Sequence, residues 1–251
     1  MTWEEILAAL LDQPAQALVW VLGSLALYLG WARLSVRVAR RPADRLGRLI
    51  AILDRPWAVE TGRSLYYVGI PYLALLQGVI NPQVLGLTRL DWFVGLGYGL
   101  PLGAGALILC ALVWQRVLEA RPSAAALLMN DATRFAQPWG WSYSLVGVVY
   151  LQAHWAFYRA VFRLLSGDLY LGTFVGLGLV TLETTLDPRP AAHLGRGDRL
   201  WRLNLALVTA VIYFFTQNLW LTTAVHLTIE MAILGLVSFR LQASRGLRGE
   251  E

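Results

Sequence analysis

The sequence is poor in charge and contains no lysine. Of its 251 residues, 15% are charged and 57% are hydrophobic, whereas an average soluble domain is about 25% charged and about 45–50% apolar. All 21 basic residues are arginine. The one cysteine, Cys110, lies in an apolar run, which excludes an intrachain disulfide and a thiolate metal site and predicts a small buried side chain. This composition predicts an integral membrane protein, in which the 11 tryptophans are expected at the membrane interfaces.

Several catalytic motifs are also missing. The chain has no His-Glu-x-x-His zinc motif, no Gly-x-Ser-Gly nucleophile of the rhomboid type and no phosphate-binding Walker pattern. A Gly-x-Gly-Asp motif of the presenilin type is absent as well, because Gly95-Leu-Gly97 is followed by Tyr98. These absences argue against the corresponding proteases and against nucleotide hydrolysis.

Seven stretches come close to the length of about 20 apolar residues that crosses a hydrocarbon core about 30 Å thick. They are residues 15–36, 64–85, 92–114, 141–165, 168–186, 200–216 and 219–239. The sequence therefore predicts an all-α fold, a polytopic transmembrane helical bundle of about seven spans. The connector 115–140 has room for a short surface helix. Residues 43–53 alternate Arg with Leu or Ile at helical spacing, which predicts a helix lying on an anionic membrane face.

The chain divides into four segments on this basis. Residues 1–63 hold the first span and an Arg-rich cytoplasmic segment, and residues 64–140 hold two further spans and the connector. Residues 141–240 form a core that contains the polar residues of interest, and residues 241–251 form a short tail.

The arginines predict the orientation of the chain. Segments 33–63, 115–140, 187–202 and 240–248 hold 18 of the 21 arginines. Seven alternating spans bring all four segments to one side, which the positive-inside rule identifies as cytoplasmic. We therefore expect an integral protein of a bacterial inner (plasma) membrane, with the N-terminus outside and the C-terminus cytoplasmic. The basic pI near 9.7 follows from these cytoplasmic arginines. It therefore predicts membrane lipid, and not nucleic acid, as the partner of the basic residues.

Five of the ionisable residues in the predicted spans are candidates for a functional site, because ionisable groups at membrane depth mark such sites by default. They are His154, Arg159, Glu183, His226 and Glu230. His226 and Glu230 are four residues apart and share a helix face, which Thr222 extends. Two imidazoles and two carboxylates suit a divalent cation such as zinc, so we predict that the two histidines and two glutamates converge on one metal site. The alternative is a structural polar cluster in which His226 and Glu230 pair with Arg159.

Three motifs in residues 141–240 resemble those of the CPBP family, which covers CAAX-processing and bacteriocin-processing intramembrane metalloproteases. The segment from His154 to Arg159, His-Trp-Ala-Phe-Tyr-Arg, resembles the family's Glu-Glu-x-x-x-Arg motif without its glutamates. Leu179-Val-Thr-Leu-Glu183 resembles Phe-x-x-x-His with Glu in place of His, and His226-Leu-Thr-Ile-Glu230 resembles the last motif, His-x-x-x-Asn/Asp. Where the family has Glu and then His, this chain has His and then Glu, a swap that keeps one imidazole and one carboxylate.

The resemblance implies an intramembrane metallo-endopeptidase acting on a membrane-associated or prenyl-like peptide. His154, Glu183, His226 and Glu230 would form the site. His154, Glu183 or Glu230 would serve as general base, and Arg159 would position its helix or polarise the substrate. The alternative is a catalytically inactive CPBP-like membrane scaffold or binding protein. A small-solute transporter is a third possibility, which the absence of a visible internal repeat disfavours.

Overall fold

The structure is a computed structural model that describes residues 12–39, 56–120, 128–186 and 196–246. Over these residues every regular element is a helix, which confirms the predicted all-α class. The predicted surface helix at 43–53 lies outside the described residues. The chain separates into two compact units, Met1–Arg89 with Tyr150–His193 and Leu90–Val149 with Leu194–Glu251, so the segment 141–240 contributes to both.

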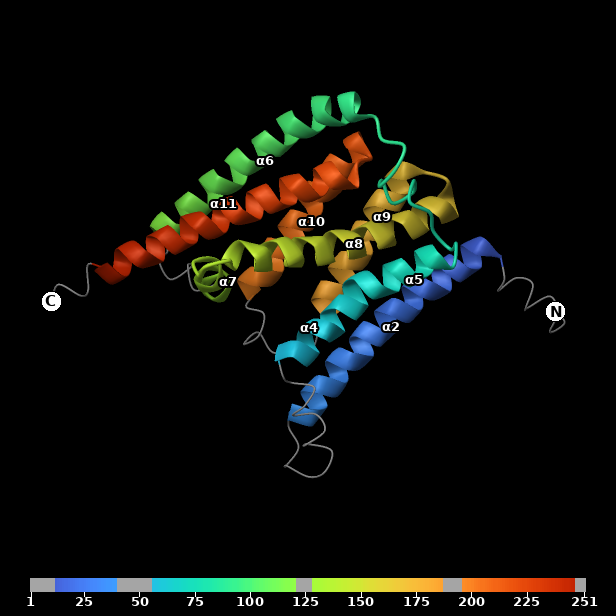
Figure 1. The fold of residues 1–251 in the computed structure, drawn as a ribbon, viewed down its shortest axis with the longest axis horizontal. Coiled ribbons are helices and arrows are strands. Elements are labelled where there is room, and N and C mark those ends of the chain that lie inside the picture. Colours follow the sequence, from blue (N-terminus) through green and yellow to red (C-terminus); the bar gives the residue numbers. More distant parts are fainter. Residues whose placement is uncertain (1–11, 40–55, 121–127, 187–195, 247–251) are drawn as a thin grey trace. The chain divides into compact units, whose positions relative to one another are not determined.

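Among its described residues, the first unit contains five helices and the larger part of a sixth. They are α2 (Gln13–Ala39), α4 (Pro56–Ser64), the π-helix η1 (Leu65–Gly69), α5 (Ile70–Leu76), α9 (Leu169–Leu186) and the part of α8 (Gly140–Ser166) that follows Val149. Helix α2 packs against α5 and α9, and Figure 1 shows α2 running beside α5.

Helices α4, η1 and α5 follow one another without a break from Pro56 to Leu76. The span predicted at 64–85 is therefore wrong in its bounds. The helical path starts eight residues earlier and stops nine residues earlier, because Gly78 adopts a left-handed backbone with φ 72° that an α-helix cannot continue. Within this path the N–H of Ile70 bonds to the carbonyl of Leu65, an i→i+5 bond that defines the π turn.

Helices α8 and α9 form an antiparallel hairpin around a short turn. Gly167 has φ 67° after the end of α8, and the carboxylate of Asp168 accepts a hydrogen bond of 2.9 Å from the N–H of Leu171 at the start of α9. The two helices then pack closely through Gly172 and Gly176, which face the backbone of α8. A Cβ on Gly172 would lie 2.7 Å from the Arg163 nitrogen, so only a residue without a side chain fits there. Small residues four apart allow this close approach in membrane helices.

The second unit contains α6 (Trp92–Ala120), α7 (Met129–Phe135), α10 (Arg196–Thr216) and α11 (Leu219–Gly246), together with the start of α8. The short helix α7 lies within the connector where a surface helix was expected. Helix α6 packs against both α10 and α11. A Cβ on Gly99 would meet Leu221, and a Cβ on Gly103 would lie 2.9 Å from Val225, so α6 and α11 run parallel. Cys110 is buried, as predicted, and accepts a hydrogen bond of 3.6 Å from Asn204.

Four helices among the described residues are long and apolar enough to cross a membrane, which identifies the chain as an α-helical membrane protein. They are formed by Gln13–Leu34, Trp92–Ala120, Leu169–Leu186 and Leu219–Gln242. Helices α8 and α10, with 27 and 21 residues, reach the length but are not among the four. Helix α8 carries His154, Arg159 and Arg163, and α10 begins with three arginines and an aspartate within seven residues.

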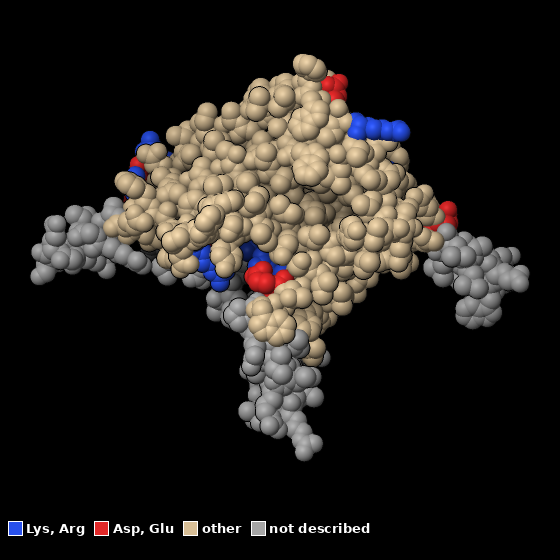
Figure 2. Space-filling model, viewed as in Figure 1, with Lys and Arg blue, Asp and Glu red and all other residues tan. Residues whose placement is uncertain are grey.

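The described surface agrees with a lipid environment. On the face shown in Figure 2, charged side chains form only a few small spots in a surface that is otherwise uncharged. Large apolar side chains are exposed along α6, where the exposed fraction of Phe93 reaches 93%. Exposed tryptophans lie at the first or second position of several helices, as expected for interfacial anchors: Trp57, Trp92, Trp141 and Trp220.

Candidate functional site

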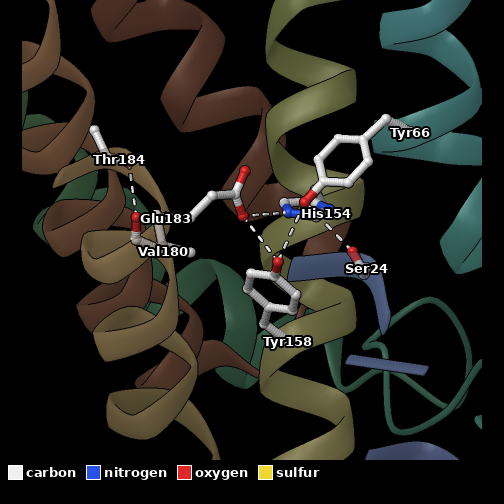
Figure 3. A network of polar contacts seen from close by, with 7 residues as sticks. All are labelled: Ser24, Tyr66, His154, Tyr158, Val180, Glu183 and Thr184. Atoms are coloured by element: carbon white, nitrogen blue, oxygen red, sulfur yellow. Dashed lines mark hydrogen bonds and ion pairs between the residues drawn. The ribbon is translucent and has the colours of Figure 1, made fainter. Parts of the chain in front are cut away.

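The first unit brings His154 of α8 and Glu183 of α9 into direct contact. His154 Nε2 lies 2.9 Å from Glu183 Oε2, and the exposed fractions of the two side chains are 1% and 7%. Figure 3 shows the two side chains meeting between their helices. The structure thus brings together two of the candidate site residues, which are 29 positions apart in the sequence.

The hairpin turn explains why these two residues meet. His154 lies 12 residues before the end of α8 at Ser166, and Glu183 lies 14 residues after the start of α9 at Leu169. At 1.5 Å per residue the two positions are both roughly 20 Å from the turn. The sequence placed Glu183 near the end of its span and His154 near the middle of its own. In an antiparallel hairpin, residues at equal distances from the turn lie opposite each other. The middle of the longer helix α8 therefore meets the end of the shorter helix α9.

The face of α9 that carries Glu183 is set by the glycines before it. The buried residues of α9 are Gly172, Thr173, Gly176, Val180 and Glu183; from Thr173 onward they recur every three or four positions, and Gly172 and Gly176 are four apart. Residues with these spacings share one helix face. Because Gly172 and Gly176 lie against the α8 backbone, Glu183 is carried onto the same side, toward His154.

Glu183 Oε2 also accepts a second hydrogen bond, from the hydroxyl of Tyr158 at 2.8 Å. Tyr158 follows His154 by one helical turn, so both residues present donors to the same carboxylate oxygen. In Figure 3 the other carboxylate oxygen of Glu183 points away from these two donors. One oxygen of Glu183 is thus held by two donors while the other is directed elsewhere.

Three tyrosine rings surround the imidazole of His154. Their centroids lie 4.4 Å away for Tyr158, 4.8 Å for Tyr66 and 5.1 Å for Tyr67, the last in an edge-on arrangement. Tyr67 in turn stacks on Tyr150 at 6.5 Å. The rings bury His154 and fix its orientation toward Glu183.

The contacts of His154 also indicate which nitrogen carries its proton. An ionised Glu183 only accepts hydrogen bonds, so Nε2 must carry a proton to bond with it. Nδ1 is buried and has no hydrogen-bond partner among the described residues. A buried N–H without an acceptor is costly, so Nε2 is assigned as the nitrogen that donates to Glu183 and Nδ1 as the nitrogen without a proton.

Arg159 lies on α8 in the same unit and is 4% exposed. A Cβ on Gly176 would lie 2.9 Å from both the nitrogen and the Cγ of Arg159. The aliphatic stem of Arg159 therefore occupies space that a side chain at position 176 would fill.

The second unit holds the other predicted pair on α11. His226 Nε2 lies 3.4 Å from Glu230 Oε2, one turn further along the helix, and the exposed fractions of the two side chains are 0% and 19%. Thr222 and Asn218 continue the stripe toward the start of the helix, and both are fully buried. The hydroxyl of Thr222 donates to the carbonyl of Asn218 at 2.8 Å. The helical spacing noted in the sequence thus places these residues on one buried face.

The structure therefore shows two His/Glu pairs, one in each unit. Among the described residues, no group of three or more His, Cys, Asp or Glu side chains is gathered closely enough to hold a metal ion. A catalytic zinc ion uses three protein ligands, whereas each pair supplies two, so neither pair by itself fits the ligand number. The four-ligand metal site remains a prediction.

Sequence reasoning missed the tyrosines around His154. A signal for Tyr158 was present, because it lies four residues after His154 and must share its face if the segment is a helix. The adjacent Tyr66 and Tyr67 belong to a helix that is far from α8 in the sequence, and nothing in the sequence indicates that they approach α8.

The fold and the site together define an α-helical membrane protein with a buried His/Glu pair. Comparison with protein-family models, with curated proteins and with solved structures gives no match. The resemblance to the CPBP family therefore rests on the three sequence motifs alone.

Proposed function

We propose that this chain is an intramembrane endopeptidase of the CPBP type, acting on a membrane-associated peptide. The observation that carries the proposal is the arrangement of Glu183, a buried carboxylate with one oxygen bonded to both His154 and Tyr158. A general base must be fixed within hydrogen-bond reach of the water it deprotonates. The second oxygen of Glu183 is suited to that role.

In this proposal Glu183, rather than His154, takes the proton of the attacking water. Nε2 of His154 is already bonded to Glu183, and Nδ1 is buried among tyrosine rings. His154 acts as the residue that orients Glu183. The swapped motifs then keep a carboxylate as the base, supplied by α9 instead of α8.

The predicted divalent cation, with zinc as the expected metal, would be held by His154, Glu183, His226 and Glu230. Imidazole and carboxylate groups are suitable ligands for zinc. Since each pair alone supplies too few ligands, no step of the proposed reaction is assigned to the metal.

We also propose seven crossings of a bacterial inner membrane, with the N-terminus outside and the C-terminus cytoplasmic. The antiparallel packing of α8 on α9 supports this arrangement, because these helices correspond to the consecutive fourth and fifth spans. The parallel packing of α6 and α11 supports it as well, because the third and seventh spans must run in the same direction.

A second candidate function is a catalytically inactive CPBP-like scaffold or binding protein. The burial of the pair favours it, because side chains with exposed fractions of 1% and 7% have little contact with the surroundings from which water must come. A pair that serves only to join α8 to α9 would have the same contacts.

Peptide hydrolysis by the purified protein in liposomes separates the two candidates. The substrate is an internally quenched peptide that ends in a farnesylated cysteine, with the same peptide lacking the lipid for comparison. We expect cleavage of the anchored peptide by the wild type and a loss of about 10²-fold or more in Glu183→Gln, the range for removing a general base. Glu60→Gln, at a half-exposed position of α4, is the matched control and should retain full activity.

Two results would contradict the proposal. Equal cleavage by wild type and Glu183→Gln would exclude Glu183 as the base. A wild type that cleaves neither peptide, while remaining folded, would favour the scaffold.

A further inference from the structure

Three hydroxyl groups from three different helices lead to Glu183 in a continuous chain of hydrogen bonds (Figure 3). The hydroxyl of Ser24 on α2 lies 3.3 Å from that of Tyr66 on η1, which lies 3.3 Å from that of Tyr158 on α8. Tyr158 lies 2.8 Å from Glu183 Oε2. Ser24 is 3% exposed, so the far end of the chain is also buried.

The direction of every bond in this chain follows from the carboxylate at its end. A hydroxyl group has a single proton to donate. Tyr158 donates its hydrogen bond to Glu183, so toward Tyr66 its oxygen can only accept one. Tyr66 has then used its own proton and accepts from Ser24. All three hydroxyls therefore point toward Glu183, and hydrogen bonds aligned in this way strengthen one another.

The π turn of the first unit places Tyr66 within this series of hydrogen bonds. Tyr66 and Tyr67 are the second and third residues of η1, and both rings contact His154. Single π turns are rare and occur frequently at functional sites. The irregularity in the helical path from Pro56 to Leu76 thus coincides with the residues that reach the His/Glu pair.

We propose that Tyr158, oriented by Tyr66 and Ser24, is a positioning residue for Glu183. His154 alone would supply one hydrogen bond, about which the carboxylate could still turn. A second donor on the same oxygen, from one helical turn further along α8, fixes the carboxylate plane and directs the other oxygen away from the pair. This proposal rests on the proposed function, because the directed oxygen matters only if Glu183 is the base.

The first test does not depend on activity. Infrared difference spectra against Glu183→Gln isolate the carboxylate band of Glu183, whose position depends on the hydrogen bonds to it. Tyr158→Phe should shift this band, and Tyr66→Phe should shift it in the same direction by a smaller amount. Tyr143→Phe, on the same helix at a position 66% exposed, is the matched control and should leave it unchanged. An unshifted band in a folded Tyr158→Phe protein would overturn the proposal.

The second test uses hydrolysis of the farnesylated peptide. Misplacement of a catalytic group by about 1 Å can reduce the rate by about 10²-fold. Tyr158→Phe should therefore lower kcat by 10-fold to 10²-fold with KM unchanged. Because Tyr66 acts through Tyr158, the double variant should be no slower than Tyr158→Phe alone. If the reductions in kcat caused by Tyr66→Phe and Tyr158→Phe multiply in the double variant, Tyr66 does not act through Tyr158, and the proposed order of the hydrogen bonds is wrong.

The two tests distinguish failure of this proposal from failure of the proposed function. A band shift in Tyr158→Phe, combined with no hydrolysis by the wild type, would support the positioning of Glu183 and contradict the peptidase. Normal hydrolysis by Tyr158→Phe would contradict the positioning role and leave Glu183 as the base.

Discussion

The close packing of α8 on α9 gives a quantitative prediction for Gly176. A Cβ at this position would lie 2.9 Å from the backbone nitrogen of Arg159 and 3.0 Å from its Cα, whereas ordinary contacts are 3.4–4 Å. Because these atoms belong to the backbone, rotation of a side chain cannot relieve the contact. In Gly176→Ala the two helices must separate by about 0.5 Å, and overpacking of this kind costs about 1–3 kcal/mol.

Gly178→Ala is the matched control on the same helix. A Cβ at Gly178 would have no neighbouring atom within 4 Å. Both variants replace a helical glycine and so share the gain of about 0.5–1 kcal/mol that alanine brings. The difference between their free energies of unfolding therefore reports the contact with Arg159 alone, and should be about 1–3 kcal/mol.

Thermal unfolding in detergent, followed by tryptophan fluorescence, measures this difference. For a chain of this size 1 kcal/mol corresponds to about 2–4 °C in Tm, so Gly176→Ala should unfold several degrees below Gly178→Ala. In the peptidase assay Gly176→Ala should also lose activity, because separation of α8 from α9 lengthens the bond between His154 and Glu183. Equal Tm values for the two variants would refute the assignment of Gly176 as a helix contact.

Three further predictions concern the second unit, the metal and the topology. Asn218→Ala should lower the stability by about 1 kcal/mol, because Asn218 Oδ1 accepts a hydrogen bond of 3.0 Å from the N–H of Leu221 and caps α11; Asn218→Ser should recover most of this loss in thermal unfolding. The purified protein should carry about one divalent metal ion per chain by elemental analysis and lose it in His226→Ala; metal-free protein that still cleaves the peptide would contradict the metal site. A reporter fused after Glu251 should be active only as a cytoplasmic marker, and an exported C-terminus would contradict the orientation.

The length of the apolar runs in the sequence predicted the bounds of several helices well. The bounds expected for the first, fourth and fifth spans lie within about three residues of α2, α8 and α9. The second span failed because its apolar run continues past Leu76 into residues that the chain uses for turns around Gly78. A hydropathy profile gives no information on a glycine with a left-handed backbone or on a π turn.

The contact between His154 and Glu183 was predictable because a hairpin with a short turn has little freedom. Once the turn at Gly167 is recognised, the register of α8 against α9 follows from counting residues along each helix. The contribution of Tyr66 could not be predicted, since it depends on how a helix from a distant part of the sequence packs against α8. Ser24 is still less accessible to prediction, because a serine in an apolar span has many possible partners.

The parallel packing of α6 and α11 also constrains how the chain between them can be threaded through a bilayer. If both helices cross in the same direction, the chain must cross an odd number of times between Ala120 and Leu219. One crossing by α9 alone satisfies this requirement, and so do three crossings by α8, α9 and α10. Two crossings, by any two of these helices, do not. The less apolar helices α8 and α10 must therefore enter the membrane together or not at all. A substitution that keeps only one of them out would invert α11 and remove its contacts with Gly99 and Gly103.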